Sequence, residues 1–158
     1  MKKFEFKLQR LLDLREARER GVQNELAILV SEQNRERLKQ DDLRRNITEF
    51  GKSLREKMRK GEVVSGEAMQ YGKFVSLATM AIDSAENRIQ GMEPGISEVR
   101  GRLIEASKER KVVEKLREKK LEEYRYELDR ETAKENDDMN QKIYLRRMVQ
   151  AAFEGGGG

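Results

Sequence analysis

Cysteine, histidine and tryptophan are absent from this chain of 158 residues, and proline occurs once. Without cysteine there are neither disulfides nor thiolate metal sites, and a reducing cytoplasm is permitted. Without histidine the chain lacks the side chain that most often acts as a general base or metal ligand near neutral pH. It also has no glycine-rich phosphate loop of the G-x-x-x-x-G-K-[ST] kind. We therefore predict no enzymatic activity, no metal site and no cofactor.

Long apolar runs and aromatic residues are also scarce. No segment approaches the roughly 18 apolar residues of a membrane span, and the N-terminus lacks the apolar core of a signal peptide. A cytoplasmic location is the simplest expectation. Charged residues make up 41% of the chain and aromatic residues 6%, which suits either long surface-rich helices or disorder. A regular apolar repeat would favour the helices, because a disordered segment does not keep one.

The segment from Ala68 to Val113 contains such a repeat. Positions alternately three and four residues apart are aliphatic or methionine, apart from one tyrosine. They are Ala68, Tyr71, Val75, Ala78, Ile82, Ala85, Ile89, Met92, Ile96, Val99, Leu103 and Ala106. A 3.5-residue repeat over so many turns is typical of a coiled-coil helix.

A second repeat precedes it and is less regular. Its apolar members are Val22, Leu26, Leu29, Leu43, Ile47, Phe50 and Leu54. Between them the same phase places Gln33, Glu36 and Gln40, and earlier it places Arg15. Polar seam residues lower stability but can fix register and partner. We expect this middle part of the first helix to be soft enough to bend.

Residues 59–66 interrupt both repeats. Gly61 follows two basic residues, as at a helix end, and Ser65 is a suitable helix N-cap. We therefore predict an all-α fold, a long antiparallel two-helix coiled-coil hairpin with a C-terminal helical overhang, as a single domain over 1–154. Its parts are a first helix over about 3–60, a tip over about 61–66, a second helix over about 67–153 and a disordered glycine tail over 155–158.

Antiparallel pairing from this tip predicts the register. It places Leu43 near Ile82, and Phe50 near Val75 and Ala78. The apolar phase passes Pro94 without a skip, so we expect one helix with a kink near 91–95 rather than two helices and a loop.

The same register leaves the end of the chain without an intramolecular partner beyond about residue 122. This end still carries apolar residues at helical spacing. They form the C-terminal stripe of Leu145, Met148, Val149 and Phe153. The stripe is a docking candidate, and the alternative is a frayed tail.

A second apolar surface lies beside the repeat of the second helix. This apolar strip consists of Phe74, Leu77 and Ala81, with Met80. An apolar strip outside the intramolecular contact is typical of a partner surface. The alternative is a broad seam that covers its own flank.

Positive charge is concentrated near the N-terminus, since residues 1–60 carry 17 basic and 11 acidic side chains. Lys2, Lys3, Lys7 and Arg10 could contact nucleic acid or an anionic membrane surface, as a basic coiled-coil scaffold would. The interleaved aromatic and arginine residues of base stacking are absent, and no one-sided cationic face is present. We therefore predict no nucleic-acid partner.

Three motifs in order resemble the flagellar FliJ family. They are Phe4-x-Phe6-x-Leu8-x-x-Leu11-Leu12-x-x-Arg15-Glu16, then Tyr71-x-x-Phe74, then the run from Ala106 to Leu116. The resemblance covers essentially the whole chain. It implies a stalk protein, similar to the central shaft of rotary ATPases, in the flagellar type III protein export apparatus.

The resemblance also implies partners and sites. The partners are the hexameric export ATPase, the cytoplasmic domain of the export-gate membrane protein and export chaperones, so membrane association is peripheral, through protein contacts. The ATPase-ring residues would be Phe4, Phe6, Lys7, Arg10, Leu11, Tyr124 and Leu128. The export-gate residues would be Tyr71, Phe74, Leu77, Ala78, Ala81 and Ala85.

Overall fold

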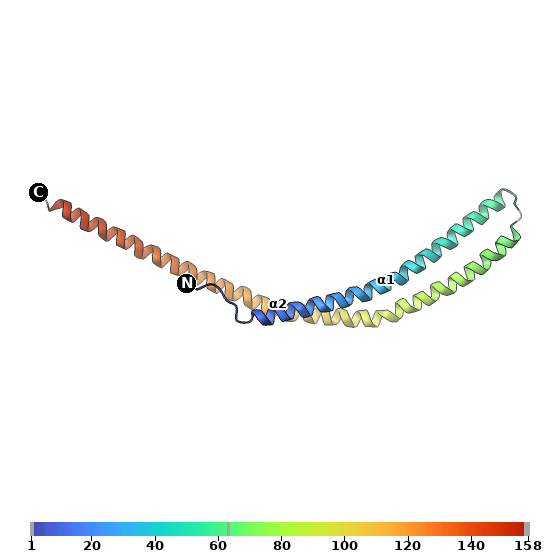
Figure 1. Ribbon diagram of the computed structural model, residues 1–158, viewed down its shortest axis with the longest axis horizontal. Helices are drawn as coiled ribbons and strands as arrows, with labels where there is room; N and C mark the ends of the chain where they lie inside the picture. Colours follow the sequence, from blue (N-terminus) through green and yellow to red (C-terminus); the bar gives the residue numbers. More distant parts are fainter. Residues whose placement is uncertain (1, 63, 157–158) are drawn as a thin grey trace. The chain divides into compact units, whose positions relative to one another are not determined.

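The computed structural model describes residues 2–62 and 64–156, and it confirms the predicted all-α hairpin. Helix α1 spans Gln9–Arg59 and helix α2 spans Ser65–Gly155. The chain divides into two compact units, one of Ala17–Ser107 and one that combines Met1–Glu16 with Lys108–Gly158. In the first of these units α1 and α2 run side by side from the tip (Figure 1).

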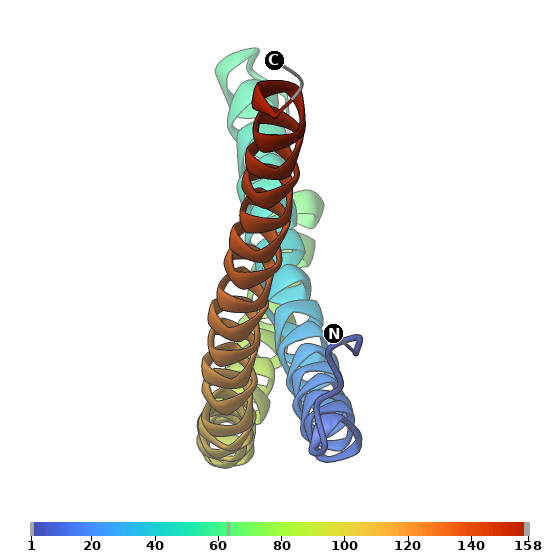
Figure 2. The ribbon, with the colours of Figure 1, turned by 90° about the vertical axis from the view of Figure 1, so that its left-hand side faces the viewer.

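The N-terminal arm, residues 2–8, is not helical, so α1 begins at Gln9 and not near residue 3. Figure 2 shows the arm as an irregular dark blue trace beside the first turns of α1. Phe4 and Phe6 alternate with charged residues, a period of two that places both rings on one side of an extended chain. Both rings are half-buried. The backbone N–H of Gln9 then donates to the Phe6 carbonyl oxygen at 3.1 Å, where α1 starts.

The tip is a glycine-capped helix end. Gly61 has φ of 77°, its N–H donates to the Met58 carbonyl, and Glu62 N–H donates to the Lys57 carbonyl, each at 3.1 Å. This is the Schellman arrangement, which satisfies carbonyls that a helix end leaves without partners. Lys57 also forms an ion pair with Glu67 at 2.9 Å across the tip. Val63 lies outside the described residues.

The core of the Ala17–Ser107 unit is the predicted repeat of α2 packed on α1. Its buried apolar residues are Val22, Ala78, Ala85, Ile89, Ile96, Val99 and Ala106. The register agrees with the prediction to within about a turn. Gln40 contacts Ile82, Glu25 pairs with Arg102 at 2.5 Å, and the ring of Phe50 contacts Tyr71 and Phe74.

Helix α2 is continuous through Pro94 (Figure 1). Pro94 is exposed, whereas Ile96 is 1% exposed, so the ring lies away from the contact with α1. Gly155 is the last residue of α2, so the tail expected over 155–158 begins inside the helix. Residues 157 and 158 are outside the described part of the chain.

Candidate interaction sites

The N-terminal arm and the first residue of α1 are held against α2 by two contacts of the Phe4 ring and two hydrogen bonds. The Phe4 ring lies 5.5 Å from the Tyr124 ring, and the Arg117 guanidinium carbon lies 5.8 Å from the Phe4 ring centroid. The Tyr124 hydroxyl donates to the Lys2 carbonyl oxygen at 2.8 Å. Arg117 Nε also donates to Gln9 Oε1 at 3.1 Å. Tyr124 and Arg117 therefore fix the arm by its first residues.

The arm and α2 enclose an open cleft of about 410 Å³. Its lining is formed by Phe4, Glu5, Phe6, Lys7, Leu8, Leu116 and Lys120. The lining thus combines apolar side chains with two lysines and one glutamate, which suits a mainly apolar partner segment that carries some acidic residues.

Only part of the predicted ATPase-ring set lines this cleft. Phe4, Phe6 and Lys7 do, whereas Tyr124 packs behind Phe4. Leu11 and Leu128 are each 36% exposed, and Arg10 is exposed, all three outside the lining.

The remaining lining residues were not predicted as site residues, and they are Glu5, Leu8, Leu116 and Lys120. The alternation of apolar and charged residues from Phe4 to Leu8 is the signal that could have identified the extended arm and its apolar face.

Near the tip, an aromatic cluster joins the two helices. The rings of Phe50 and Tyr71 are stacked, 5.3 Å apart and 6° from parallel, and Phe74 lies 5.9 Å from Phe50. Gly51 is buried, and a Cβ atom there would lie 3.0 Å from the Tyr71 hydroxyl oxygen. Tyr71 is therefore a packing residue of the hairpin, and Phe74 is shared between this cluster and the apolar strip.

The apolar strip itself is open to solvent. Leu77 is 68% exposed, Met80 is 64% exposed, and Ala81 is exposed as well. By contrast, Ala78 and Ala85 are 4% and 1% exposed. These two lie one heptad apart in the contact with α1, so they cannot form part of a free docking surface. Their predicted part in gate binding is therefore not carried into the exposed strip.

Few charges border the strip, and one of them is already paired. Arg88 donates from Nε and Nη2 to Glu36 Oε2 at 3.1 and 3.0 Å.

The hydrogen bonds from Arg88 are the main cause that lowers the pKa of Glu36 below its ordinary value of 4.5, with Lys39 adding to it. The amide of Gln40, followed by that of Gln90, lowers the pKa of Glu86 in the same way. Both carboxylates are therefore stabilised in their charged form when the hairpin is folded.

These lowered pKa values predict acid sensitivity. A carboxyl whose folded pKa is lowered stabilises the fold above its unfolded pKa, and this contribution is lost as the pH falls through the folded value. We expect the melting temperature to fall between about pH 5 and pH 3. The variant with Glu36→Gln and Glu86→Gln should show a smaller fall, measured by circular dichroism at each pH. An equal fall in both proteins would contradict the conclusion that Glu36 and Glu86 contribute to the acid sensitivity.

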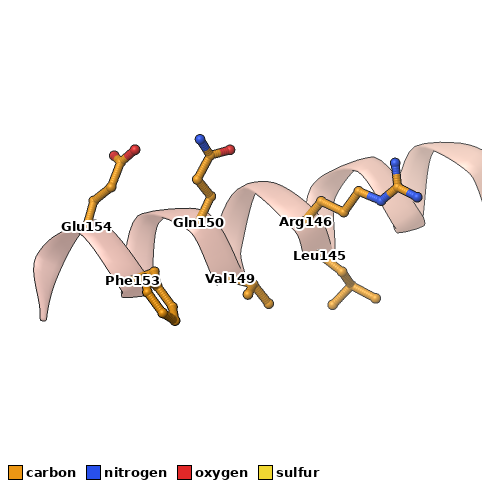
Figure 3. Close-up of a pocket in the computed structure, with 6 residues that line it drawn as sticks. All are labelled: Leu145, Arg146, Val149, Gln150, Phe153 and Glu154. Carbon is orange, nitrogen blue, oxygen red and sulfur yellow. The ribbon is translucent and has the colours of Figure 1, made fainter.

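The C-terminal stripe is an exposed face on the distal part of α2. Leu145, Val149 and Phe153 point to one side of the helix, and Arg146, Gln150 and Glu154 point to the other (Figure 3). Phe153 is 86% exposed and Met148 is 53% exposed. Among the described residues from 125 to 156, no side chain is buried. The stripe has the spacing with which an amphipathic helix docks in a partner's groove.

Neither a membrane span nor a metal site is found in the described part of the chain. No helix there is both long and apolar enough to cross a membrane. The described residues also contain no group of three or more acidic, histidine or cysteine side chains that could hold a metal ion.

Comparison with known families gives a match over nearly the whole chain. The family described as Flagellar FliJ protein matches residues 4–149. Neither the curated proteins nor the solved structures gave a match. The matched range contains residues 4–8 of the N-terminal arm, the tip and the apolar strip. The chain belongs to the flagellar FliJ family, a family of structural components of flagellar protein export.

Proposed function

We propose that this protein is a stalk that couples parts of the flagellar type III export apparatus. Its partners are the export ATPase hexamer, the export-gate membrane protein and export chaperones. It catalyses no reaction itself, resides in the cytoplasm and associates with the inner membrane through these protein contacts. Family membership supports a role in flagellar export, and the three separate surfaces support several simultaneous partners.

The observation that carries the proposal is the anchored N-terminal arm. Tyr124 and Arg117 hold Phe4 in place, so the cleft exists before a partner arrives. A preformed site lowers the entropic cost of association. Phe6 and Leu8 offer apolar contacts there, and Lys7 and Lys120 offer charge. We assign this cleft to the ATPase ring.

The other two surfaces take the remaining partners. We assign Leu77 and Ala81, with the exposed edge of Phe74, to the cytoplasmic domain of the export gate, because this strip is apolar and weakly charged. The C-terminal stripe offers Leu145, Val149 and Phe153 as spaced anchors for a helical chaperone segment. Exposed aromatic and aliphatic anchors of this kind usually dominate the energy of an interface.

The ATPase assignment predicts the effect of removing the two aromatic rings of the arm. The variant with Phe4→Ala and Phe6→Ala should need at least about tenfold more protein to stimulate the export ATPase, as expected when interface anchors are lost. Helicity should stay nearly unchanged, since both residues precede α1. ATPase rates across a concentration series, with circular dichroism, provide the measurement.

The matched control is Leu77→Ala, which removes an exposed apolar side chain from the Ala17–Ser107 unit. It should leave stimulation unchanged. A collapse of helicity in the arm variant would mean that the rings only hold local structure. Normal stimulation with intact helicity would exclude the cleft as the ATPase site.

A further inference from the structure

Two buried glutamines of α1 make the same pair of hydrogen bonds to α2. Gln33 Nε2 donates to the Ile89 carbonyl oxygen at 3.3 Å and to Glu93 Oε1 at 2.7 Å. Gln40 Nε2 donates to the Ile82 carbonyl oxygen at 3.1 Å and to Glu86 Oε2 at 3.0 Å. Each glutamine is 4% exposed. Each amide thus joins a backbone carbonyl to the carboxylate one turn further along α2.

We propose that these two glutamine clamps, each consisting of one glutamine with its carbonyl and carboxylate acceptors, lock the register of the hairpin. The sequence pattern alone predicted a soft, polar middle for α1. The structure instead gives every buried side-chain amide there an acceptor, and in the described residues no buried side-chain nitrogen or oxygen lacks a hydrogen-bond partner. The polar positions are therefore specific contacts.

The apolar seam by itself discriminates poorly against a slip of one heptad. Ile82, Ile89 and Ile96 are spaced seven apart, so sliding α1 by seven residues exchanges one isoleucine for another. Ala78 and Ala85 repeat in the same way. Sequences that repeat with the period of the fold specify their register weakly unless a polar residue intervenes.

The clamps break this degeneracy because their acceptors do not continue the repeat. A slip in one direction moves Gln40 onto Ile89 and Glu93, but it moves Gln33 onto Ile96 and Arg100, a side chain with no acceptor atom. A slip in the other direction moves Gln33 onto Ile82 and Glu86, and it moves Gln40 onto Val75 and Thr79, which carries no carboxylate. The first slip leaves Gln33 without a side-chain acceptor, and the second offers Gln40 a short hydroxyl in place of a carboxylate.

Cross-linking of introduced cysteines tests the lock directly, because the chain has no cysteine of its own. The Arg88 and Glu36 side chains meet at their ends, so Glu36→Cys with Arg88→Cys, joined by a short bis-maleimide, reports the native register. Glu36→Cys with Ala81→Cys and Glu36→Cys with Gly95→Cys report slips of one heptad in either direction. All pairs share Glu36→Cys, so the loss of its ion pair is common to them.

With the glutamines present, only the native pair should form the intramolecular cross-link in dilute protein. In the background of Gln33→Leu with Gln40→Leu, the slipped pairs should cross-link at least about fivefold more, while helicity and melting temperature are kept or raised, as when an apolar pair replaces a buried polar one. Unchanged slipped cross-linking in this folded background would overturn the proposal, because the tip and the apolar packing would then set the register.

A second background separates the clamp from the general effect of a polar seam. Glu86→Lys with Glu93→Lys keeps both glutamines and removes their carboxylate acceptors. The proposal expects slipped cross-linking to rise here too. No rise would overturn the part assigned to the carboxylates. Neither test depends on the export ATPase or gate, so its result is independent of the proposed function.

Discussion

Replacing Ala85 by aspartate is expected to open the hairpin, whereas the same change at Ala81 should leave it folded. Ala85 is 1% exposed in the contact with α1, and Ala81, four residues earlier, faces solvent. An unpaired carboxylate in a buried contact costs about 3–5 kcal/mol, a large part of the stability of a small protein. Circular dichroism should show Ala85→Asp with a much lower melting temperature and Ala81→Asp close to the native protein.

The same pair tests the export-gate assignment. Ala81→Asp should abolish binding to the cytoplasmic domain of the gate protein, because it places a charge in an apolar interface. Stimulation of the export ATPase should persist, since the cleft of the N-terminal arm is untouched. Loss of both activities together with reduced helicity would show that Ala81 is structural.

Replacing Phe50 by alanine is expected to destabilise the hairpin by about 2–3 kcal/mol, somewhat below the cost for a fully buried ring. Its ring contacts Tyr71 and Phe74, so the change removes both aromatic contacts of the cluster. Urea unfolding followed by circular dichroism measures the change in the free energy of unfolding. Leu77→Ala is the control and should lie within about 0.5 kcal/mol of the native protein, because its side chain is largely exposed.

If Leu77→Ala proved as costly as Phe50→Ala, the apolar strip would be packed and could not be a docking surface. Phe74→Ala is a poorer test of docking. Its ring lies 5.9 Å from that of Phe50, so the change would lower stability and partner binding together.

The fold could be predicted because one physical rule acts along the whole contact. A 3.5-residue repeat aligns one face of each helix with the other, and a glycine break fixes where the chain reverses. Once Gly61 is placed at the tip, counting predicts the register to within about a turn, which leaves its exact value to specific contacts. The pairing of Gln40 with Ile82 lies within a turn of the expected partners.

The start of α1 and the surface of the apolar strip could not be predicted from that rule. A first helix that starts near residue 3 ignores the shorter period of two in the arm. In α2, Ala78 and Ala85 occupy positions of the repeat, whereas Leu77 and Ala81 each precede such a position by one residue. The repeat alone therefore does not show where the contact with α1 ends. The burial of each alanine depends on how closely α1 approaches.

The carboxylate acceptors of the glutamine clamps also could not be predicted from the sequence pattern. Gln33 and Gln40 look like defects in an apolar repeat, and glutamate is common on every helix face of this chain. Only the relative rotation of α1 and α2 brings Glu86 and Glu93 to the amides. The signal that remains in the sequence is the spacing, because the two glutamines lie seven residues apart and so do their two glutamate acceptors.

The exposed distal part of α2 has a consequence for how the protein melts. From residue 125 to 155 no described side chain is buried, so this segment relies on its own backbone hydrogen bonds and local contacts. A helix of this kind melts by a gradual helix–coil transition, fraying from its end as temperature rises. The paired part unfolds cooperatively, so calorimetric and van't Hoff enthalpies should differ. A partner that binds the C-terminal stripe would then also raise the helix content of the segment it holds.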